Sequence, residues 1–202
     1  MIYIYGAGKR CELIKSLLAE LQNSEKIILI DNKHSKIKNV KSNNYLCHNY
    51  NYFKDTILIA VSNPDQKSKI YGNLKKKINF KLHDPIISNS ATLKKNVSIG
   101  KGSIIMDNAY IGQNVKIRKN CFVGINSLVS HDTKINDFVD ISHNVNIAGN
   151  VVINENSYIG IGATIIQKIQ VEKNCFIGAK VLLKKNVKKF SKITLKQNLK
   201  TK

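Results

Sequence analysis

A six-residue hydrophobic period runs through the second half of this 202-residue chain. Every sixth residue from Ile87 to Leu183 is aliphatic, which gives seventeen consecutive positions without an exception. A second column, from Ala91 to Val187, advances in the same steps and holds small or β-branched residues. An α-helix is excluded because its hydrophobic period is about 3.6 residues. This half of the chain is therefore an internal repeat.

A parallel β-helix accounts for this period. Each six-residue unit forms a short strand and a turn, and three units close a triangular coil of about 18 residues. The aliphatic column then stacks inside, and the small column fits the tighter space near the corners. Glycines directly follow aliphatic positions at Gly100, Gly112, Gly124, Gly160 and Gly178, where turns are expected. The pattern predicts between five and six coils, which by themselves could form a purely structural solenoid.

The first 84 residues follow a different pattern, in which short apolar runs alternate with amphipathic stretches. We expect strands at 1–5, 26–30, 56–61 and 78–82, with helices at 11–21 and 66–76. Such alternation predicts a parallel sheet that binds ligands at the carboxyl ends of its strands. Asp84 and Pro85 mark a linker. The predicted domains are a small α/β domain at 1–84, a β-helix at 85–187 and a basic tail at 188–202.

Three predicted loops follow the strands of the α/β domain and carry Gly6 to Gly8, Asp31 to Asn32, and Ser62 to Pro64. Gly6-x-Gly8 is only part of a dinucleotide fingerprint, since Cys11 stands where a third glycine would be. The domain is also short for a complete dinucleotide fold. We therefore expect a nucleotide half-site. Asp31 could bind a ribose or uracil group, or it could cap a turn.

The charge balance favours an anionic partner. The chain has 33 Lys and Arg against 13 Asp and Glu, a formal net charge of +20. Nucleic acid, anionic lipid and phosphorylated small molecules all suit this charge. No aromatic residues interleave with arginine as a base-stacking surface requires, so nucleic acid is not expected. Between Lys184 and Lys202 there are eight lysines and no acidic residue, which predicts a solvated, mobile tail.

Other signals concern location and metals. No apolar run approaches the roughly 18 residues of a membrane span. The first residues lack the charged region and cleavage site of an export signal. The four cysteines show no CxxC spacing, so they predict neither a zinc site nor a disulfide framework. We expect a cytoplasmic protein without a metal.

Both halves together resemble one family over nearly the whole chain. This is the bacterial hexapeptide-repeat sugar acetyltransferase family, with its UDP-4-amino-sugar N-acetyltransferases and sialic acid O-acetyltransferases. The resemblance rests on five motifs in their order and spacing: Ile2-Tyr3-Ile4-Tyr5-Gly6-Ala7-Gly8, Ile57-Leu58-Ile59-Ala60-Val61-Ser62-Asn63, Val129-Ser130-His131-Asp132, Asp137-Phe138-Val139-Asp140-Ile141 and Ala148-Gly149-Asn150-Val151. It implies a left-handed β-helix, a homotrimer, acetyl-CoA between neighbouring β-helices, and a nucleotide sugar between the α/β domain and the β-helix.

The resemblance makes His131 the general base and Asp132 the carboxylate that holds its imidazole. General chemistry supports this role, because an imidazole can accept the proton of an attacking amine near neutral pH. A carboxylate beside it stabilises the imidazolium that forms. His131 follows Val129 by two residues, so it falls in a turn and not in the inward column. His143 is the other histidine of the repeat.

The remaining site residues are also implied by the resemblance. Backbone N–H groups near Gly149 are expected to stabilise the oxyanion. The acetyl-CoA site is expected to contain Asp140, Gly149, Ile161 and Ala179. The nucleotide sugar is expected to contact Gly8, Lys9, Arg10, Asp31, Asn32 and Ser62.

Two departures from the family stand out. Family members usually read Gly-Gly-His or Ser-Gly-His where this chain has Gly8-Lys9-Arg10, which adds two cations beside the expected substrate. Arg10 could bind phosphate through two hydrogen bonds, or both cations could point to solvent. A second family histidine, on the acetyl-CoA side, is replaced by Asp140.

The leading hypothesis is an acetyl-CoA-dependent N-acetyltransferase that modifies an amino sugar on a nucleotide carrier, for bacterial surface glycan or glycoprotein assembly. The amine would attack the thioester directly. One alternative is O-acetylation of a sialic-acid-like sugar, since the sequence does not encode the nucleophile. A second is a weakly catalytic binding subunit of a sugar-synthesis complex.

Overall fold

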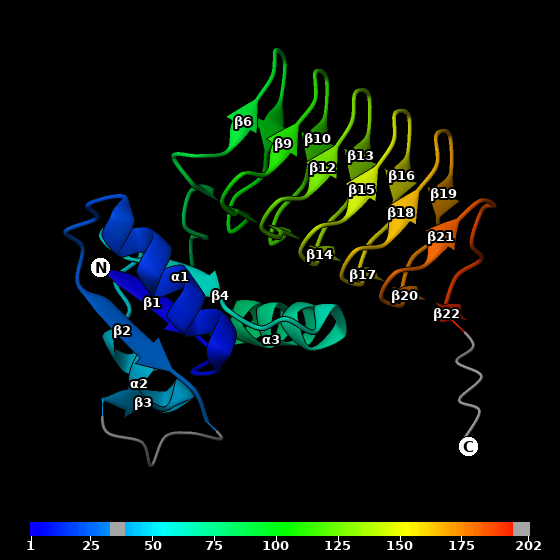
Figure 1. Cartoon of the computed structure of the whole chain (residues 1–202). Helices are drawn as coiled ribbons and strands as arrows, with labels where there is room; N and C mark the ends of the chain where they lie inside the picture. The colour runs from blue at the N-terminus through cyan, green and yellow to red at the C-terminus, as the bar shows by residue number, and fades with distance from the viewer. Residues whose placement is uncertain (33–38, 196–202) are drawn as a thin grey trace, which may run out of the picture.

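The computed structural model describes residues 1–32 and 39–195. The chain forms an α/β domain followed by a long parallel β-solenoid (Figure 1). The predicted tail lies partly outside this range, from residue 196 onward.

The α/β domain contains β1 (Ile2–Tyr5), α1 (Lys9–Glu20), β2 (Ile27–Ile30), β3 (Val40–Lys41), α2 (Asn43–Asn49), β4 (Thr56–Ile59) and α3 (Pro64–Lys77). Its four strands are all parallel, in the order β3-β2-β1-β4. Three of the four expected strands and both expected helices are present, with small shifts at their ends. The expected strand at 78–82 is wrong, because only an isolated bridge between Leu82 and Ile57 forms there.

Strands of two residues build the β-solenoid and stack in three sheets. The first sheet contains β5 (Ile86–Ile87), β8 (Ile104–Ile105), β11 (Phe122–Val123), β14 (Asp140–Ile141), β17 (Tyr158–Ile159), β20 (Phe176–Ile177) and β22 (Lys192–Ile193). The second contains β6 (Thr92–Leu93), β9 (Tyr110–Ile111), β12 (Leu128–Val129), β15 (Asn146–Ile147), β18 (Thr164–Ile165) and β21 (Leu182–Leu183). The third contains β7 (Ser98–Ile99), β10 (Lys116–Ile117), β13 (Lys134–Ile135), β16 (Val152–Ile153) and β19 (Gln170–Val171). Together they make about six turns of a solenoid that resembles left-handed β-helices.

Both predicted columns point inward, which confirms the repeat. From Ile105 to Leu183 the aliphatic column is at most 5 % exposed, and the small column packs beside it in one continuous core. The corners repeat as well, because every sixth residue from Asn96 to Lys180 has a positive φ. Asparagine and glycine tolerate this left-handed conformation best, which explains why asparagine is so frequent in the repeat.

The last turn corrects the predicted domain boundary at residue 187. Strand β22 continues the first sheet, and Val187 is buried. Earlier strand partners are 18 residues apart, as in the pair Leu128–Asn146, whereas Ile177 pairs with Ile193. This turn is therefore shorter than the others, so the six-residue count breaks after Leu183 although the fold continues.

The α/β domain packs on the outer face of the first sheet. Helix α1 shares a core with Ile104, Met106 and Phe122 of the β-helix. Helix α3 contacts the corner beside this sheet, where the rings of Tyr71 and Phe138 lie 5.4 Å apart. One sheet of the triangular prism is thus covered, and the corner between the other two sheets lies opposite the α/β domain.

Candidate active site

His131 lies in the turn between β12 and β13, at the corner that joins the second and third sheets. Its Nδ1 is 2.8 Å from Oδ2 of Asp132, and the His131 side chain is 53 % exposed. A carboxylate can only accept a hydrogen bond, so Nδ1 carries the proton and donates it. This tautomer leaves the lone pair of Nε2 free to accept a proton.

Asp132 is held from a second direction by a ladder of asparagines. Asn96 donates to Oδ1 of Asn114 at 3.1 Å, and Asn114 donates to Oδ1 of Asp132 at 2.9 Å. All three residues occupy the same positive-φ corner position in successive turns. The hydrogen bonds from His131 and Asn114 lower the pKa of Asp132. The carboxylate thus stays charged and fixes the imidazole.

Gly149 lies one turn further along the same corner, against the imidazole of His131. A Cβ added to Gly149 would lie 2.5 Å from both Nε2 and Cε1 of the ring. Any larger residue would therefore displace the imidazole. The groove beside His131 has a volume of about 430 Å³ and is lined by Lys94, Lys95, Tyr110, Gly112, Gln113, Ser130 and His131.

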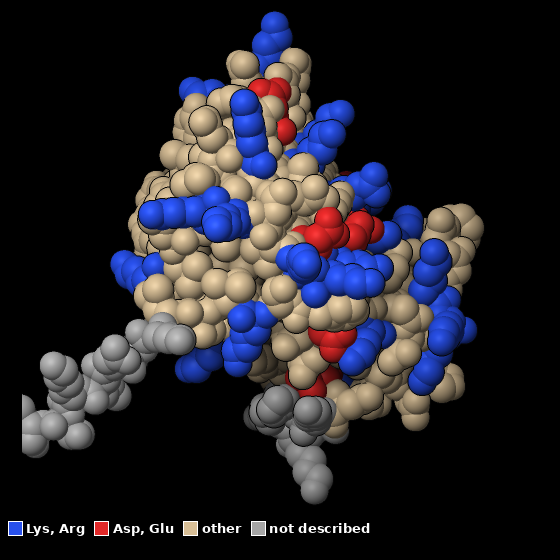
Figure 2. All heavy atoms as spheres, turned by 90° about the vertical axis from the view of Figure 1, so that its right-hand side faces the viewer, with Lys and Arg blue, Asp and Glu red and all other residues tan. Residues whose placement is uncertain are grey.

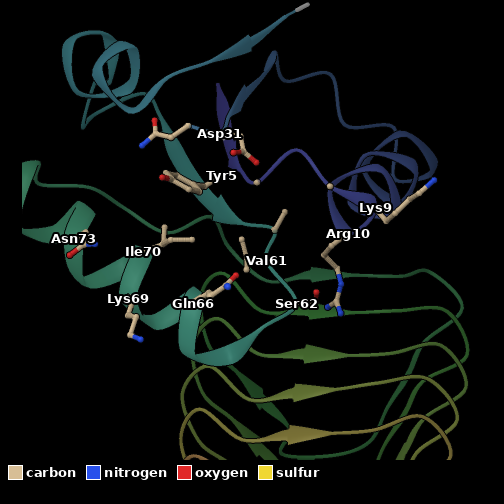
Figure 3. Close-up of a pocket in the computed structure, with 14 residues that line it drawn as sticks. Tyr5, Lys9, Arg10, Asp31, Val61, Ser62, Gln66, Lys69, Ile70 and Asn73 are labelled. Atoms are coloured by element: carbon tan, nitrogen blue, oxygen red, sulfur yellow. The ribbon is translucent and has the colours of Figure 1, made fainter. Parts of the chain in front are cut away.

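A second cavity opens at the carboxyl ends of β1, β2 and β4. We call it the α1 pocket, since the start of α1 forms one wall (Figure 3). Its volume is about 650 Å³. All six residues expected to contact the nucleotide sugar line it: Gly8, Lys9, Arg10, Asp31, Asn32 and Ser62. The carboxyl-end rule for parallel strands explains why these separate loops meet.

The N-terminus of α1 is suited to an anion. Gly8 is its N-cap and provides no side-chain hydrogen bond to the first turn. Free N–H groups and the helix dipole together favour a phosphate at such a position. The backbone of Gly8 is unstrained, and a Cβ there would meet nothing within 4 Å. Glycine thus keeps the approach to the helix open.

The two neighbouring cations point in different directions. In Figure 3, Lys9 extends away from the cavity and Arg10 points toward the β-helix beside Ser62. Both terminal nitrogens of Arg10 donate to the carboxylate of Asp140, each at 3.1 Å. Arg10 was expected either to bind phosphate or to point to solvent. Its guanidinium does neither here, because it pairs with a carboxylate of the protein.

Asp140 does not fit its expected place in the acetyl-CoA site. Its side chain has no exposed surface and accepts hydrogen bonds from Arg10 and from Lys67, whose Nζ lies 3.3 Å away. A ligand cannot reach this carboxylate while the α/β domain covers it. Lys67 has no local sequence signal for this role, because it lies on α3 and is 73 residues from Asp140 in the chain.

His143 occupies a different corner, between the first and second sheets. Its Nδ1 accepts a hydrogen bond from the N–H of Ile125 at 3.0 Å. Burial, and to a smaller extent the charge of Arg10, lower the pKa of His143, so it is neutral at physiological pH. Ile161 and Ala179 follow it along this corner and are exposed. The four residues expected at acetyl-CoA thus divide among two corners and a buried cluster.

The His131 corner and the α1 pocket lie on opposite sides of one chain. Figure 1 shows the turns between the second and third sheets along the upper edge, and the α/β domain at the lower left. None of the residues that the structure describes lines both cavities. A single chain therefore does not bring the proposed base to the pocket.

The remaining surface is rich in basic side chains, as the net charge predicts. Lys and Arg side chains are spread over the face shown in Figure 2, with far fewer acidic groups. Among the described residues, no cluster of His, Cys, Asp and Glu could hold a metal ion. None of the helices in the described part of the chain is long and apolar enough to cross a membrane.

Comparisons with known proteins support the resemblance. The acetyltransferase domain of PglB from Neisseria gonorrhoeae is 25 % identical with a TM-score of 0.85, and the match covers 95 % of this chain and 94 % of that one. The same domain in complex with acetyl coenzyme A is 26 % identical over 92 % and 91 % of the two chains, with a TM-score of 0.82. No family model and no curated protein sequence matches the chain.

A more distant structure shares the fold. PerB from Caulobacter crescentus, solved with CoA and GDP-perosamine, has a TM-score of 0.82 at 17 % identity over 92 % of this chain and 89 % of that one. The sequence-based resemblance is thereby confirmed: over nearly its whole length, this chain has the architecture of the bacterial sugar N-acetyltransferases that are built on a hexapeptide-repeat β-helix.

Proposed function

We propose that the chain is an acetyl-CoA-dependent N-acetyltransferase that acts on a nucleotide-linked amino sugar in bacterial surface glycan biosynthesis. The observation that carries this proposal is the His131–Asp132 pair, which is oriented, exposed and fixed against Gly149 at a corner of the β-helix. The PglB acetyltransferase domain, which was solved with acetyl coenzyme A, supports acetyl-CoA as the donor.

His131 acts as the general base in this proposal. The sugar amine attacks the thioester carbonyl carbon as Nε2 of His131 takes the amine proton. The C–N bond forms, the C–S bond then breaks, and His131 returns the proton to the departing thiolate of CoA. Asp132 stabilises the imidazolium between these two transfers. Backbone N–H groups near Gly149 stabilise the oxyanion.

The α1 pocket binds the nucleotide sugar. The N-terminus of α1 holds the diphosphate through its backbone, with the main chain of Gly8 and Lys9 closest to it. Asp31 and Asn32 lie at the end of β2, where the nucleoside binds, and Ser62 lies toward the β-helix, where the sugar binds. Support comes from the meeting of these residues around one cavity, and PerB was solved with a nucleotide sugar.

A homotrimer completes the site. His131 and the α1 pocket lie on opposite sides of one chain, so the base must come from a neighbouring copy. The outward residues of the second sheet are uncharged, and Tyr110, Leu128 and Leu182 are 38–50 % exposed. The third sheet instead presents Lys116 and Lys134. The second sheet is therefore the face that packs against another subunit, as apolar patches commonly do. Both substrates are cytoplasmic metabolites, so we place the enzyme in the cytoplasm.

A CoA-release assay tests this function. Purified full-length protein is mixed with acetyl-CoA and a panel of nucleotide-linked amino sugars, and free nonulosonic acids serve as O-acetylation acceptors. We expect turnover with an amino sugar and formation of an amide. Turnover with a nonulosonic acid alone would show that the chain is an O-acetyltransferase and not an N-acetyltransferase. No turnover with any acceptor would reject the proposal that the chain is an acetyltransferase.

A further inference from the structure

Two departures from the family pattern that lie far apart in sequence form one structural unit. Arg10 replaces a family histidine in the first loop, Asp140 replaces another in the β-helix, and the structure pairs them through two hydrogen bonds of 3.1 Å. The Cζ of Arg10 also lies 3.4 Å from the centre of the Phe122 ring. The guanidinium is thus fixed by a carboxylate in its plane and by an aromatic ring below it.

Arg10 lines the α1 pocket and has hydrogen-bond donors that its pair with Asp140 does not use. A guanidinium has five N–H groups, and the pair with Asp140 uses only two of them. The side chain is 15 % exposed and lines the pocket at the end nearest the β-helix, beside Ser62 (Figure 3). The start of α1 lies above it. A diphosphate held by α1 would therefore present its sugar to Arg10.

Lys67 contacts the same carboxylate but has a different position. Its Nζ lies 3.3 Å from Oδ2 of Asp140 and 3.2 Å from the backbone oxygen of Asn120, and its side chain is 4 % exposed. It does not line the α1 pocket. Lys67 therefore joins the two domains away from the pocket, whereas Arg10 joins them and also lines the pocket.

We propose that Arg10 determines specificity for the acceptor sugar and that Asp140 is its positioning residue. Resting on the function proposed above, this assigns Arg10 to the hydrogen-bond-accepting oxygens of the sugar, since a guanidinium only donates. Asp140 touches no ligand and acts by holding Arg10 on Phe122. Without Asp140, Arg10 and Lys67 would be two unpaired cations at this interface, whereas without Arg10 the carboxylate would keep Lys67 as its partner.

Calorimetric titration of the full-length protein without acetyl-CoA tests this assignment. The probes are GDP-perosamine and a UDP-linked 4-amino sugar, with GDP and UDP as sugar-free counterparts. Arg10→Met leaves Asp140 paired with Lys67, so the fold is retained. It should weaken binding of the sugar nucleotide by about 10- to 100-fold, the range for a charge-assisted hydrogen bond, and leave nucleoside diphosphate binding unchanged.

Two further variants separate positioning from domain docking. Asp140→Asn keeps Arg10 but releases it, so it should weaken sugar-nucleotide binding, and the double variant with Arg10→Met should be no weaker than Arg10→Met alone. Lys67→Met is the matched control: it removes the other cation and leaves the Arg10–Asp140 pair, so sugar-nucleotide binding should be retained. If Asp140→Asn does not fold, Arg10→Met and Lys67→Met still decide the question.

The outcomes are distinguishable. Equal losses for the sugar nucleotide and the nucleoside diphosphate in Arg10→Met would place Arg10 on the phosphates and overturn the assignment. Equal losses of sugar-nucleotide binding in Arg10→Met and Lys67→Met would show that Arg10, Lys67 and Asp140 only hold the two domains together. Binding without turnover in the wild type would reject the proposed acetyl transfer alone, and the binding data would still judge Arg10. No binding of any probe would overturn both.

Discussion

His131 projects from a narrow corner of the β-helix and is half exposed, whereas the residues of the α1 pocket surround about 650 Å³ at the edge of a sheet. The corner has an oriented imidazole beside a smaller groove of about 430 Å³. The pocket has a helix N-terminus and polar side chains, and none of its lining residues is a histidine. In the proposed mechanism, reactivity and recognition therefore depend on different residues, so substitutions at the corner should change kcat and substitutions in the pocket should change KM.

The largest expected effect is that of His131→Ala. Loss of the general base should lower kcat by roughly 10²–10⁴ with little change in Tm, because the side chain is exposed. The matched control is His143→Asn, whose amide oxygen can replace Nδ1 as acceptor for the Ile125 N–H. It should keep kcat. A loss of kcat in His143→Asn with a retained kcat in His131→Ala would instead make His143 the base.

The next largest fall in kcat is expected for Asp132→Asn, and it should exceed the fall in Asp132→Ala. An asparagine at 132 would accept from Asn114 as its neighbours in the ladder do, and its amide nitrogen would then donate to Nδ1 of His131. That moves the imidazole proton to Nε2 and removes the base. We expect kcat to fall roughly 10²–10³-fold for Asn and about tenfold for Ala. Equal kcat values in the two variants would contradict this tautomer argument.

Acid should not abolish activity through Asp132. Hydrogen bonds from His131 and Asn114 hold the pKa of this carboxyl below its ordinary 3.8, so the charge is present at every pH above that value and is lost only below it. Above pH 3.8, titration of Asp132 should therefore add no acid limb to the pH profile of kcat in the wild type compared with Asp132→Ala. A second acid limb in the wild type, beyond the one that the general base itself produces, would contradict this if it were missing in Asp132→Ala.

Gly149→Ala should lower kcat by about 10², since a displacement of the base by about 1 Å has this effect. The added Cβ would lie 2.5 Å from Nε2, so the ring must move. In a His131→Ala background the same change should have no further effect on kcat. Additive losses would show that Gly149 acts through the backbone.

The smallest effect is expected in the α1 pocket. Gly8→Ala has room for its Cβ, so Tm should hold, but the methyl group narrows the approach to the helix N-terminus. We expect KM for the nucleotide sugar to rise roughly three- to tenfold at constant kcat. Gly72→Ala, which is equally unobstructed on α3, is the control and should leave KM unchanged.

The β-helix could be predicted almost completely because one local rule repeats. Each turn buries the same two columns, so residues such as Ile141 and Val145 were assigned to the core without knowledge of distant contacts. The rule failed at the shortened last turn, where Ile193 replaces the expected partner of Ile177. Strand β3 and helix α2 were not predicted, since their polar, asparagine-rich sequence has no clear period.

The site was predictable where its residues are adjacent or where topology brings them together. His131 and Asp132 are neighbours, and the carboxyl-end rule collects the residues of the α1 pocket. The pair Arg10–Asp140 spans 130 residues and has no local signature. Asp140 occupies an outward strand position that is normally exposed. The bulky outward residues Ile104 and Phe122 are the signal that another domain covers this sheet.

The most direct test of the central claim mixes two inactive variants. His131→Ala keeps the pocket, and Gly8→Trp blocks the pocket but keeps the base. The two are coexpressed with different affinity tags, and trimers carrying both tags are purified. If each site takes its pocket from one subunit and His131 from the next, one of the three sites in every mixed trimer is intact, and activity should recover to about one third of the wild-type value. Activity no higher than that of the separate variants would show that the base and the pocket belong to the same chain.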